Sequence, residues 1–115
     1  MVVKQGDIFW INFGKPTGSK PANLRPAVVI QCDTFNESKI NTAVVAAITS
    51  NLKYENLPGN VRLLKGEANI PKASVVNVSS ITTVDKEQLN EKIGHLSKMK
   101  INNIKAGLKI LFDIE

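Results

Sequence analysis

The sequence predicts an α+β domain in which a small, strongly bent antiparallel β-sheet, or partial barrel, carries a helix packed across it. Two observations predict this fold class. Five short runs rich in β-branched and aromatic residues are separated by turn signals, and from Asp85 the apolar period changes to that of helices. Strands that come first and helices that follow them favour an α+β arrangement.

The five strand patterns occupy residues 8–13, 26–32, 42–48, 61–64 and 74–84, the last with a kink after residue 78. The segment 14–23 between the first two has two glycines and two prolines, so we expect an exposed loop, and loops of this length commonly carry function. The segment 33–39 is predicted to be a turn or one short helical turn.

A short helix is predicted after the last strand. Asp85 is a suitable N-cap, Gln88 stands where a capping box places Glu or Gln, and Leu89 and Ile93 lie four residues apart. This helix is expected to end at Gly94.

A final amphipathic helix is predicted to begin after Ser97. Its apolar positions are Ile101, Ile104, Leu108 and Leu111, and lysines occupy the other face. The lysine face could contact RNA, but a solvated polar face is the simpler interpretation. His95 is expected to be a packed or surface residue rather than a base.

Composition and length favour one ordinary globular domain that spans residues 1–115. Hydrophobic residues make up 43% and charged residues 22%, which excludes a disordered chain. No apolar run is long enough to cross a bilayer and the first residues lack a signal-peptide core, so we expect a cytoplasmic protein without a membrane partner. One cysteine and one histidine cannot build a zinc site, so no metal or cofactor is expected.

The net charge of +5 favours a polyanionic partner, either nucleic acid or an acidic protein. Thirteen of the 15 basic residues are lysines, and only Arg25 and Arg62 are arginines. A lysine cannot reproduce the bidentate hydrogen bonds that a guanidinium makes to phosphate or carboxylate. In this lysine-rich chain, an arginine is therefore a candidate for such a contact.

Arg25 stands where the predicted loop meets a buried strand. The core behind would hold its backbone while the guanidinium faces the loop; the plainer alternative is that Arg25 pairs with a nearby carboxylate. Thr49 follows the next apolar strand and begins a run of small polar residues with Ser50 and Asn51. If these two strands are neighbours, Arg25 and Thr49 could meet at their ends.

Several motifs occur in a fixed order along the chain. They are Gly6-Asp7-Ile8, Gly18-Ser19, Arg25-Pro26-Ala27-Val28-Val29-Ile30-Gln31, Ala46-Ala47-Ile48-Thr49-Ser50, Leu57-Pro58, Ala73-Ser74-Val75-Val76, Ile81-Thr82-Thr83-Val84-Asp85-Lys86 and Ile93-Gly94-His95-Leu96. In this order and spacing the chain resembles the MazF/PemK toxins over residues from about 3 to 108.

The resemblance implies the CcdB/MazF-like plasmid maintenance toxin fold, a small barrel with a C-terminal helix. It implies a sequence-specific, metal-independent endoribonuclease that cleaves single-stranded RNA, an mRNA interferase whose products carry a 2′,3′-cyclic phosphate and a 5′-hydroxyl. It also implies a homodimer that is neutralised by an acidic, MazE-like antitoxin of a type II toxin–antitoxin module. The catalytic pair of the family falls on Arg25 and Thr49.

The chemistry suits these two residues, because RNA supplies its own nucleophile, the 2′-hydroxyl. The protein must orient that group in line with the phosphate and stabilise the charge on the phosphorane oxygens. A guanidinium holds its proton too tightly to be a good base, so Arg25 is expected to stabilise charge. Thr49 is expected to donate a hydrogen bond to a phosphate oxygen, since it lacks a partner base that would make it a nucleophile.

Eight further residues are candidates for RNA contacts. They are Ser19, Lys20, Asn23, Ser50, Ser74, Asn77, Ser79 and Ser80. Members of the family often carry Glu-Gln and glycine where this chain has Lys20-Pro21 and Asn23, and a Glu-Gln pair in place of Ser79-Ser80. Hydroxyls read base edges differently from carboxylates and amides, so the preferred RNA sequence is expected to differ from that of relatives.

Two other functions remain open at the level of the sequence. CcdB toxins share the barrel but poison DNA gyrase by binding it, so the fold alone does not separate the two activities. A catalytically inactive module that binds RNA or antitoxin is the other alternative, motivated by the changed loop and the serine pair. The retention of both Arg25 and Thr49 favours the nuclease.

Overall fold

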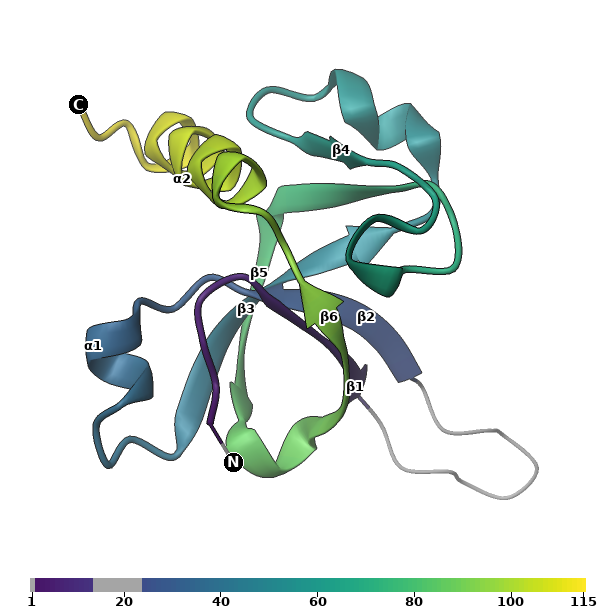
Figure 1. Cartoon of the computed structure of the whole chain (residues 1–115). Helices are drawn as coiled ribbons and strands as arrows, with labels where there is room; N and C mark the ends of the chain where they lie inside the picture. The colour runs from purple at the N-terminus through teal and green to yellow at the C-terminus, as the bar shows by residue number, and fades with distance from the viewer. Residues whose placement is uncertain (1, 14–23) are drawn as a thin grey trace.

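A computed structural model describes residues 2–13 and 24–115 (Figure 1). The described part forms one antiparallel sheet of six strands in the order β4-β5-β3-β2-β1-β6. The strands are β1 (Asp7–Asn12), β2 (Leu24–Val29), β3 (Thr42–Thr49), β4 (Val61–Leu63), β5 (Ser74–Asp85) and β6 (Leu89–His95). The helices are α1 (Asp33–Asn36) and α2 (Lys98–Phe112), with 3₁₀ turns η1 (Leu52–Asn56), η2 (Glu67–Asn69) and η3 (Lys86–Gln88).

The sheet is strongly bent, and α2 lies across the half that contains β4 and the first part of β5 (Figure 1). In the described chain β4 and β6 are the two edges, so the sheet is a half-barrel and does not close. These features confirm the predicted α+β class, the bent antiparallel sheet and the C-terminal helix. No helix in residues 2–13 and 24–115 is long and apolar enough to cross a membrane.

The neighbouring strands β1, β2 and β3 bury side chains on both faces, which explains their nearly continuous apolar sequences. One core lies under α2, and the other lies inside the opposite half of the bend. The first contains Ile8, Val28, Ala46, Ile48, Val61, Leu63, Ile70, Val76, Val78, Leu96 and Ile104; the second contains Val3, Phe9, Ile11, Ala27, Val29, Ala43, Val45, Val84 and Leu89. Alternate residues of one strand thus enter different cores, as the two-residue period of a strand requires.

The predicted kink in the longest strand is confirmed by its register with β3. Ala46 pairs with Ile81, whereas Ala47 pairs with Asn77, so residues 78–80 form an irregularity in the ladder. The side chain of Asn60 accepts a hydrogen bond from the Val78 amide at 3.0 Å. The bend of β5 therefore has a polar support from the turn before β4.

The predicted helix from Asp85 to Gly94 is wrong. The capping signal is real, since the Gln88 side chain accepts a bond from the Asp85 amide at 2.8 Å, but it closes only the single turn η3. The chain then continues as β6, which pairs with β1 from Leu89 opposite Ile11 to His95 opposite Asp7. Pairing with β1 supplies backbone partners and buries Leu89, and this outweighs local helix propensity.

The predicted final helix is confirmed. Ser97 is its N-cap, and its hydroxyl accepts a bond from the Lys100 amide at 3.3 Å. Ile104 is buried, and Ile101 and Leu108 are half-buried against the first core, as the helical period predicts. Leu111 remains exposed, so the last predicted apolar position is not covered in the described chain.

Candidate active site

A pocket of about 300 Å³ lies where the start of β2 meets the end of β3. Its lining comes from four parts of the chain: Trp10 and Phe13, Arg25 and Pro26, Ala47 to Ser50, and Ile70 to Lys72 with Ser74. Both predicted catalytic residues are therefore in one pocket. Two of the predicted RNA contacts, Ser50 and Ser74, line it as well.

Strand register explains why Arg25 and Thr49 come together. Ala27 and Ala47 are the last pair of the β2–β3 ladder, and the same register continued by two residues along each strand brings Arg25 toward Thr49. Side chains two residues apart lie on the same face, so the two residues share a face. On its other side Arg25 pairs with Ile11 of β1, so β1 holds its backbone while its side chain is exposed.

The Thr49 hydroxyl is oriented by the turn that follows β3. Its oxygen accepts a hydrogen bond from the Asn51 amide at 3.1 Å. The Asn51 side chain in turn accepts from the Lys53 amide at 3.2 Å and caps η1. Because the hydroxyl acts as an acceptor in this turn, its proton remains for donation to a ligand.

Ser74 has a structural contact inside the pocket wall. It is only 5% exposed, and its hydroxyl donates to the carbonyl oxygen of Lys72 at 2.9 Å. Ser74 also pairs with Leu63 of β4. The hydroxyl therefore holds the bend that carries Lys72, whereas Ser50 is exposed beside Thr49.

Three predicted RNA contacts lie at the irregular part of β5 and do not line the pocket. The side-chain oxygen of Asn77, Oδ1, accepts a hydrogen bond from the Ser79 hydroxyl at 2.9 Å, and Ser80 is half-buried. Their contact with RNA stays a prediction. Ser19, Lys20 and Asn23 fall outside the residues that the structure describes.

Sequence reasoning missed three residues of the pocket. Trp10, opposite Pro26 in the β1–β2 ladder, and Phe13, just beyond β1, add aromatic surface. The concentration of aromatics in residues 8–13 was a usable signal, although it was interpreted only as strand propensity. Lys72 carried no signal in the sequence, because its place at the pocket depends on the packing of Ile70 into the core under α2.

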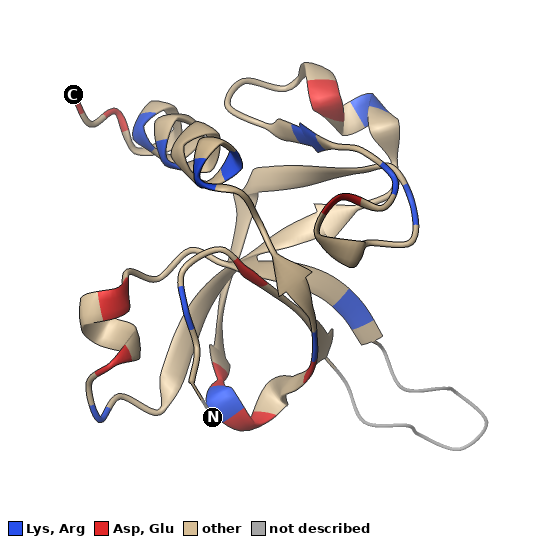
Figure 2. Cartoon of the chain, viewed as in Figure 1, with Lys and Arg blue, Asp and Glu red and all other residues tan. Residues whose placement is uncertain are grey.

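The electrostatics of the pocket favour an anion. Its described lining contains two cations, Arg25 and Lys72, and no carboxylate. The adjoining strands β3 and β5 are almost free of charge, and most lysines lie on α2 and in the loops (Figure 2). Within residues 2–13 and 24–115, no group of three or more His, Cys, Asp and Glu residues could hold a metal ion. The arrangement suits a phosphate bound by side chains.

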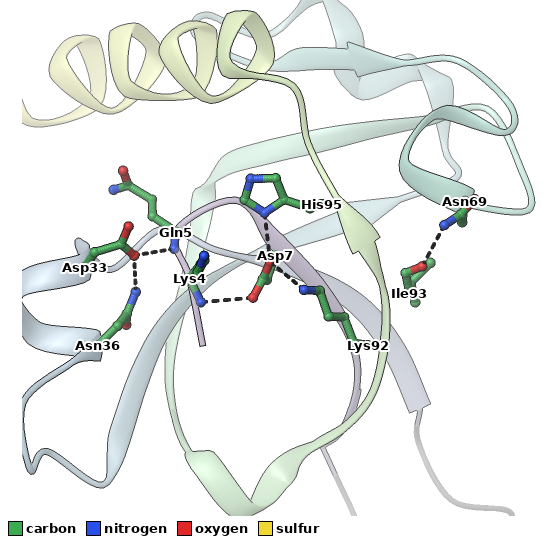
Figure 3. Close-up of polar contacts among 9 residues, drawn as sticks. All are labelled: Lys4, Gln5, Asp7, Asp33, Asn36, Asn69, Lys92, Ile93 and His95. Atoms are coloured by element: carbon green, nitrogen blue, oxygen red, sulfur yellow. Dashed lines mark hydrogen bonds and ion pairs between the residues drawn. The ribbon is translucent and has the colours of Figure 1, made fainter. Parts of the chain in front are cut away.

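A second polar cluster stands apart from this pocket and ties β1 to β6 (Figure 3). The Asp7 carboxylate is fully buried and accepts from the Lys4 amide at 2.9 Å. It also contacts His95 Nδ1 at 2.7 Å and Lys92 Nζ at 3.2 Å. His95 is therefore packed against a structural carboxylate, which agrees with the sequence-based expectation for it.

Known proteins resemble the chain over nearly its whole length. Endoribonuclease MazF6 of Mycobacterium tuberculosis is 38% identical over 114 residues, which cover 99% of this chain and 100% of the relative. Endoribonuclease EndoA of Bacillus subtilis is 34% identical over 110 residues, covering 96% and 94%. A solved mycobacterial endoribonuclease in complex with its cognate antitoxin has the same fold, with a TM-score of 0.78 at 17% identity and coverage of 97% and 96%.

The fold, the pocket and these relatives define an endoribonuclease toxin. The family model described as PemK-like, MazF-like toxin of type II toxin–antitoxin system matches residues 4–112, and the chain belongs to that family. The resemblance inferred from the sequence motifs is thereby confirmed. The gyrase-poisoning alternative is not favoured, since the curated relatives are named endoribonucleases.

Proposed function

We propose that this toxin cleaves single-stranded RNA in the pocket between β2 and β3, with Arg25 and Thr49 as the catalytic pair and without a metal ion. The observation that carries the proposal is the β2–β3 register, which brings these two side chains to one pocket. That pocket has two cations and no carboxylate in its described lining. Such a site attracts the phosphate backbone of a nucleic acid.

The reaction follows from the chemistry of RNA. The 2′-oxygen attacks the neighbouring phosphorus, the bond from phosphorus to O5′ breaks, and the proton lost from the 2′-hydroxyl is balanced by one gained at O5′. The products are a 2′,3′-cyclic phosphate and a 5′-hydroxyl. The Arg25 guanidinium stabilises the charge that develops on the phosphorane oxygens, and the Thr49 hydroxyl donates a hydrogen bond to one of them.

Two aromatic residues of the pocket support a single-stranded substrate. Trp10 and Phe13 line the same space as Arg25. Unstacked bases of single-stranded RNA pack on aromatic faces, whereas the bases of a duplex are stacked on one another and cannot. The sequence preference that we propose depends on such base contacts and on the predicted contacts at Ser79 and Ser80.

The partners that we propose are a second copy of the chain and an acidic, MazE-like antitoxin, in the cytoplasm. One structural neighbour was solved in complex with its antitoxin. The net charge of +5 and the carboxylate-free pocket lining favour an acidic segment in the groove that takes RNA. RNA and antitoxin should then weaken each other's binding. Independent binding of both would contradict a shared groove.

Substitutions at the catalytic pair test the proposal directly. Arg25→Ala should lower the cleavage rate about 10²- to 10³-fold, the usual loss for one donor aimed at a developing oxyanion. Arg25→Lys should recover little, because lysine keeps the charge but not the fork. Thr49→Val should slow cleavage and leave folding intact, whereas Thr49→Ser should keep most of the rate. Rates are measured on a defined oligoribonucleotide, with circular dichroism as the check on folding.

The chemistry of the substrate gives a second, independent readout. Excess EDTA should leave the rate unchanged, and a deoxyribose on the 5′ side of the scissile bond should abolish cleavage. Cleavage that persists in the deoxy substrate, or stops in EDTA, would show that the 2′-hydroxyl mechanism is wrong even though the family is established.

A further inference from the structure

Lys72 is the cation of the pocket that the proposed chemistry does not use, and its backbone is fixed on both sides. On one side Ile70 is 2% exposed and belongs to the core under α2. On the other side the buried Ser74 hydroxyl bonds the Lys72 carbonyl oxygen at 2.9 Å. A rigid proline, Pro71, lies between. The side chain therefore leaves the wall of the pocket from a defined point.

The ammonium group of Lys72 makes no hydrogen bond or ion pair with any described residue. This separates it from cations that hold the fold together. Lys92 contacts Asp7, Lys100 lies 3.9 Å from Glu67, and Arg62 contacts Glu55 at 2.7 Å. Lys72 is exposed, has no partner among the described residues and lies on a pocket without a carboxylate in its described lining, so it can accept an anionic ligand at little desolvation cost.

The topology places Lys72 and Arg25 on different sides of Thr49. β3 lies between β2 and β5, Arg25 belongs to β2, and Lys72 lies in the segment that enters β5. Thr49 pairs with Val75, three residues after Lys72. If the scissile phosphate lies at Arg25 and Thr49, a neighbouring phosphate of the RNA can lie on the β5 side of Thr49. The long, flexible side chain of Lys72 could then contact it.

We propose that Lys72 binds a non-scissile phosphate of the RNA substrate and that Ser74 positions it by holding its backbone. The inference rests on the function proposed above. A neighbouring phosphate needs only a point charge, because its geometry does not change in the reaction, and a lysine supplies that without the bidentate fork that the scissile phosphate requires. The contact is the same in ground state and transition state, so it contributes to KM and not to kcat.

Kinetics on a defined oligoribonucleotide test this assignment. Lys72→Gln should raise KM about 3- to 10-fold and leave kcat within about 2-fold, and the salt dependence of kcat/KM should become shallower by about 0.7 in logarithmic slope, the loss of one phosphate contact on a single strand. Lys72→Arg should keep the slope. The matched control is Lys65→Gln, which replaces an exposed lysine that does not line the pocket. It should leave both KM and the salt dependence of kcat/KM unchanged.

A neutral phosphate in the substrate identifies the contact. A methylphosphonate is placed in turn at each phosphate flanking the scissile one. At one of these positions the methylphosphonate should weaken binding by the wild type. At that same position it should not weaken binding by Lys72→Gln any further, since the two changes remove the same interaction. Additive losses at both positions would overturn the proposal.

Ser74→Ala tests the positioning role. It should raise KM less than Lys72→Gln does, and it should add nothing when Lys72 is already glutamine. An additive effect would mean that Ser74 acts on its own, for example through direct contact with RNA. If the wild type fails to cleave RNA at all, the proposed function fails; if it cleaves and the KM and salt slope of Lys72→Gln are unchanged, only the assignment of Lys72 fails.

Discussion

Asp33 joins the N-terminal segment to α1 through one carboxylate. Its Oδ1 accepts a hydrogen bond from the Gln5 amide at 2.8 Å and one from the Asn36 side chain at 3.1 Å (Figure 3). The bond from the Gln5 amide, helped by Asn36 and by the charge of Lys4, holds the pKa of Asp33 below its ordinary value of 3.8. Folding therefore stabilises the ionised form.

This pKa shift predicts how stability changes in acid. The unfolded chain binds the proton of Asp33 more readily, so the stabilisation is complete above about pH 4 and is lost as the pH falls through the lowered pKa. In urea unfolding, Asp33→Asn should have a lower free energy of unfolding than the wild type at pH 7. This difference should become smaller below pH 4. The control is Asp113→Asn, whose carboxylate bonds nothing in the described chain. A difference in the free energy of unfolding that stays the same down to acidic pH would show that the lowered pKa of Asp33 is not its cause.

The sequence predicts some pocket residues and not others for a physical reason. Arg25 lies near the start of one apolar strand and Thr49 at the end of another. The sequence places them in one site if these two strands are neighbours in the sheet. The Ser74 hydroxyl bonds the carbonyl two residues earlier, a local contact that any serine in a turn could make. Lys72 is placed at the pocket wall because Ile70 packs into the core under α2. That packing joins residues distant in the chain, so no local pattern reveals it.

At the scale of elements, β6 shows why one segment was predicted incorrectly. Leu89 and Ile93 are four residues apart, and a spacing of four puts two side chains on one face of a helix and also on one face of a strand. The signal was therefore ambiguous, and the capping residues tipped the prediction toward a helix. β1 decides the outcome, because its free edge takes up residues 89–95 as a strand.

Two glycines set the position of α2 against the turn before β4. Gly59 has φ +79°, and Gly107 of α2 packs directly on it, so a Cβ added at Gly107 would overlap the Gly59 carbonyl. Backbone of one element thus touches backbone of the other. The helix can approach β4 this closely only while both positions lack a side chain.

A substitution at Gly107 tests this contact. Alanine normally favours a helix over glycine by about 1 kcal/mol, yet Gly107→Ala should destabilise the protein by about 1–3 kcal/mol because α2 must move away from the turn. Denaturant unfolding measures the change. Asn102→Ala, on the exposed face of α2, is the control and should be neutral or slightly stabilising. A stability gain at Gly107 equal to that of the control would show that the helix is free to shift.

The whole molecule leaves apolar surface uncovered at the end of its last helix. Ile110, Leu111 and Phe112 are all exposed, and Ile110 and Phe112 are more than half exposed at 60% and 57%. Exposed large apolar side chains grouped at one end of a helix are a candidate for a site where another chain binds. It is the surface on which we expect the proposed homodimer to depend.

Light scattering tests the homodimer. The protein should be a dimer at micromolar concentration, and Ile110→Lys combined with Phe112→Lys should weaken the dimer about tenfold or more, because apolar anchors dominate such interfaces. Leu64→Lys, at an exposed leucine just after β4, is the control and should have no effect. A monomeric wild type with full nuclease activity would exclude a role for the dimer.

The pairing of β1 with β6 has a consequence for synthesis. Asp7 pairs with His95, and the Leu96 amide donates to the Gly6 carbonyl at 3.0 Å, so the first strand acquires its second neighbour only after nearly the whole chain has been made. Leu89, Leu96 and Ile104 complete the two cores from the same late part of the chain. We therefore expect the nascent chain on the ribosome to lack a stable sheet, and a toxin that acts on RNA to become competent only after its release from the message that encodes it.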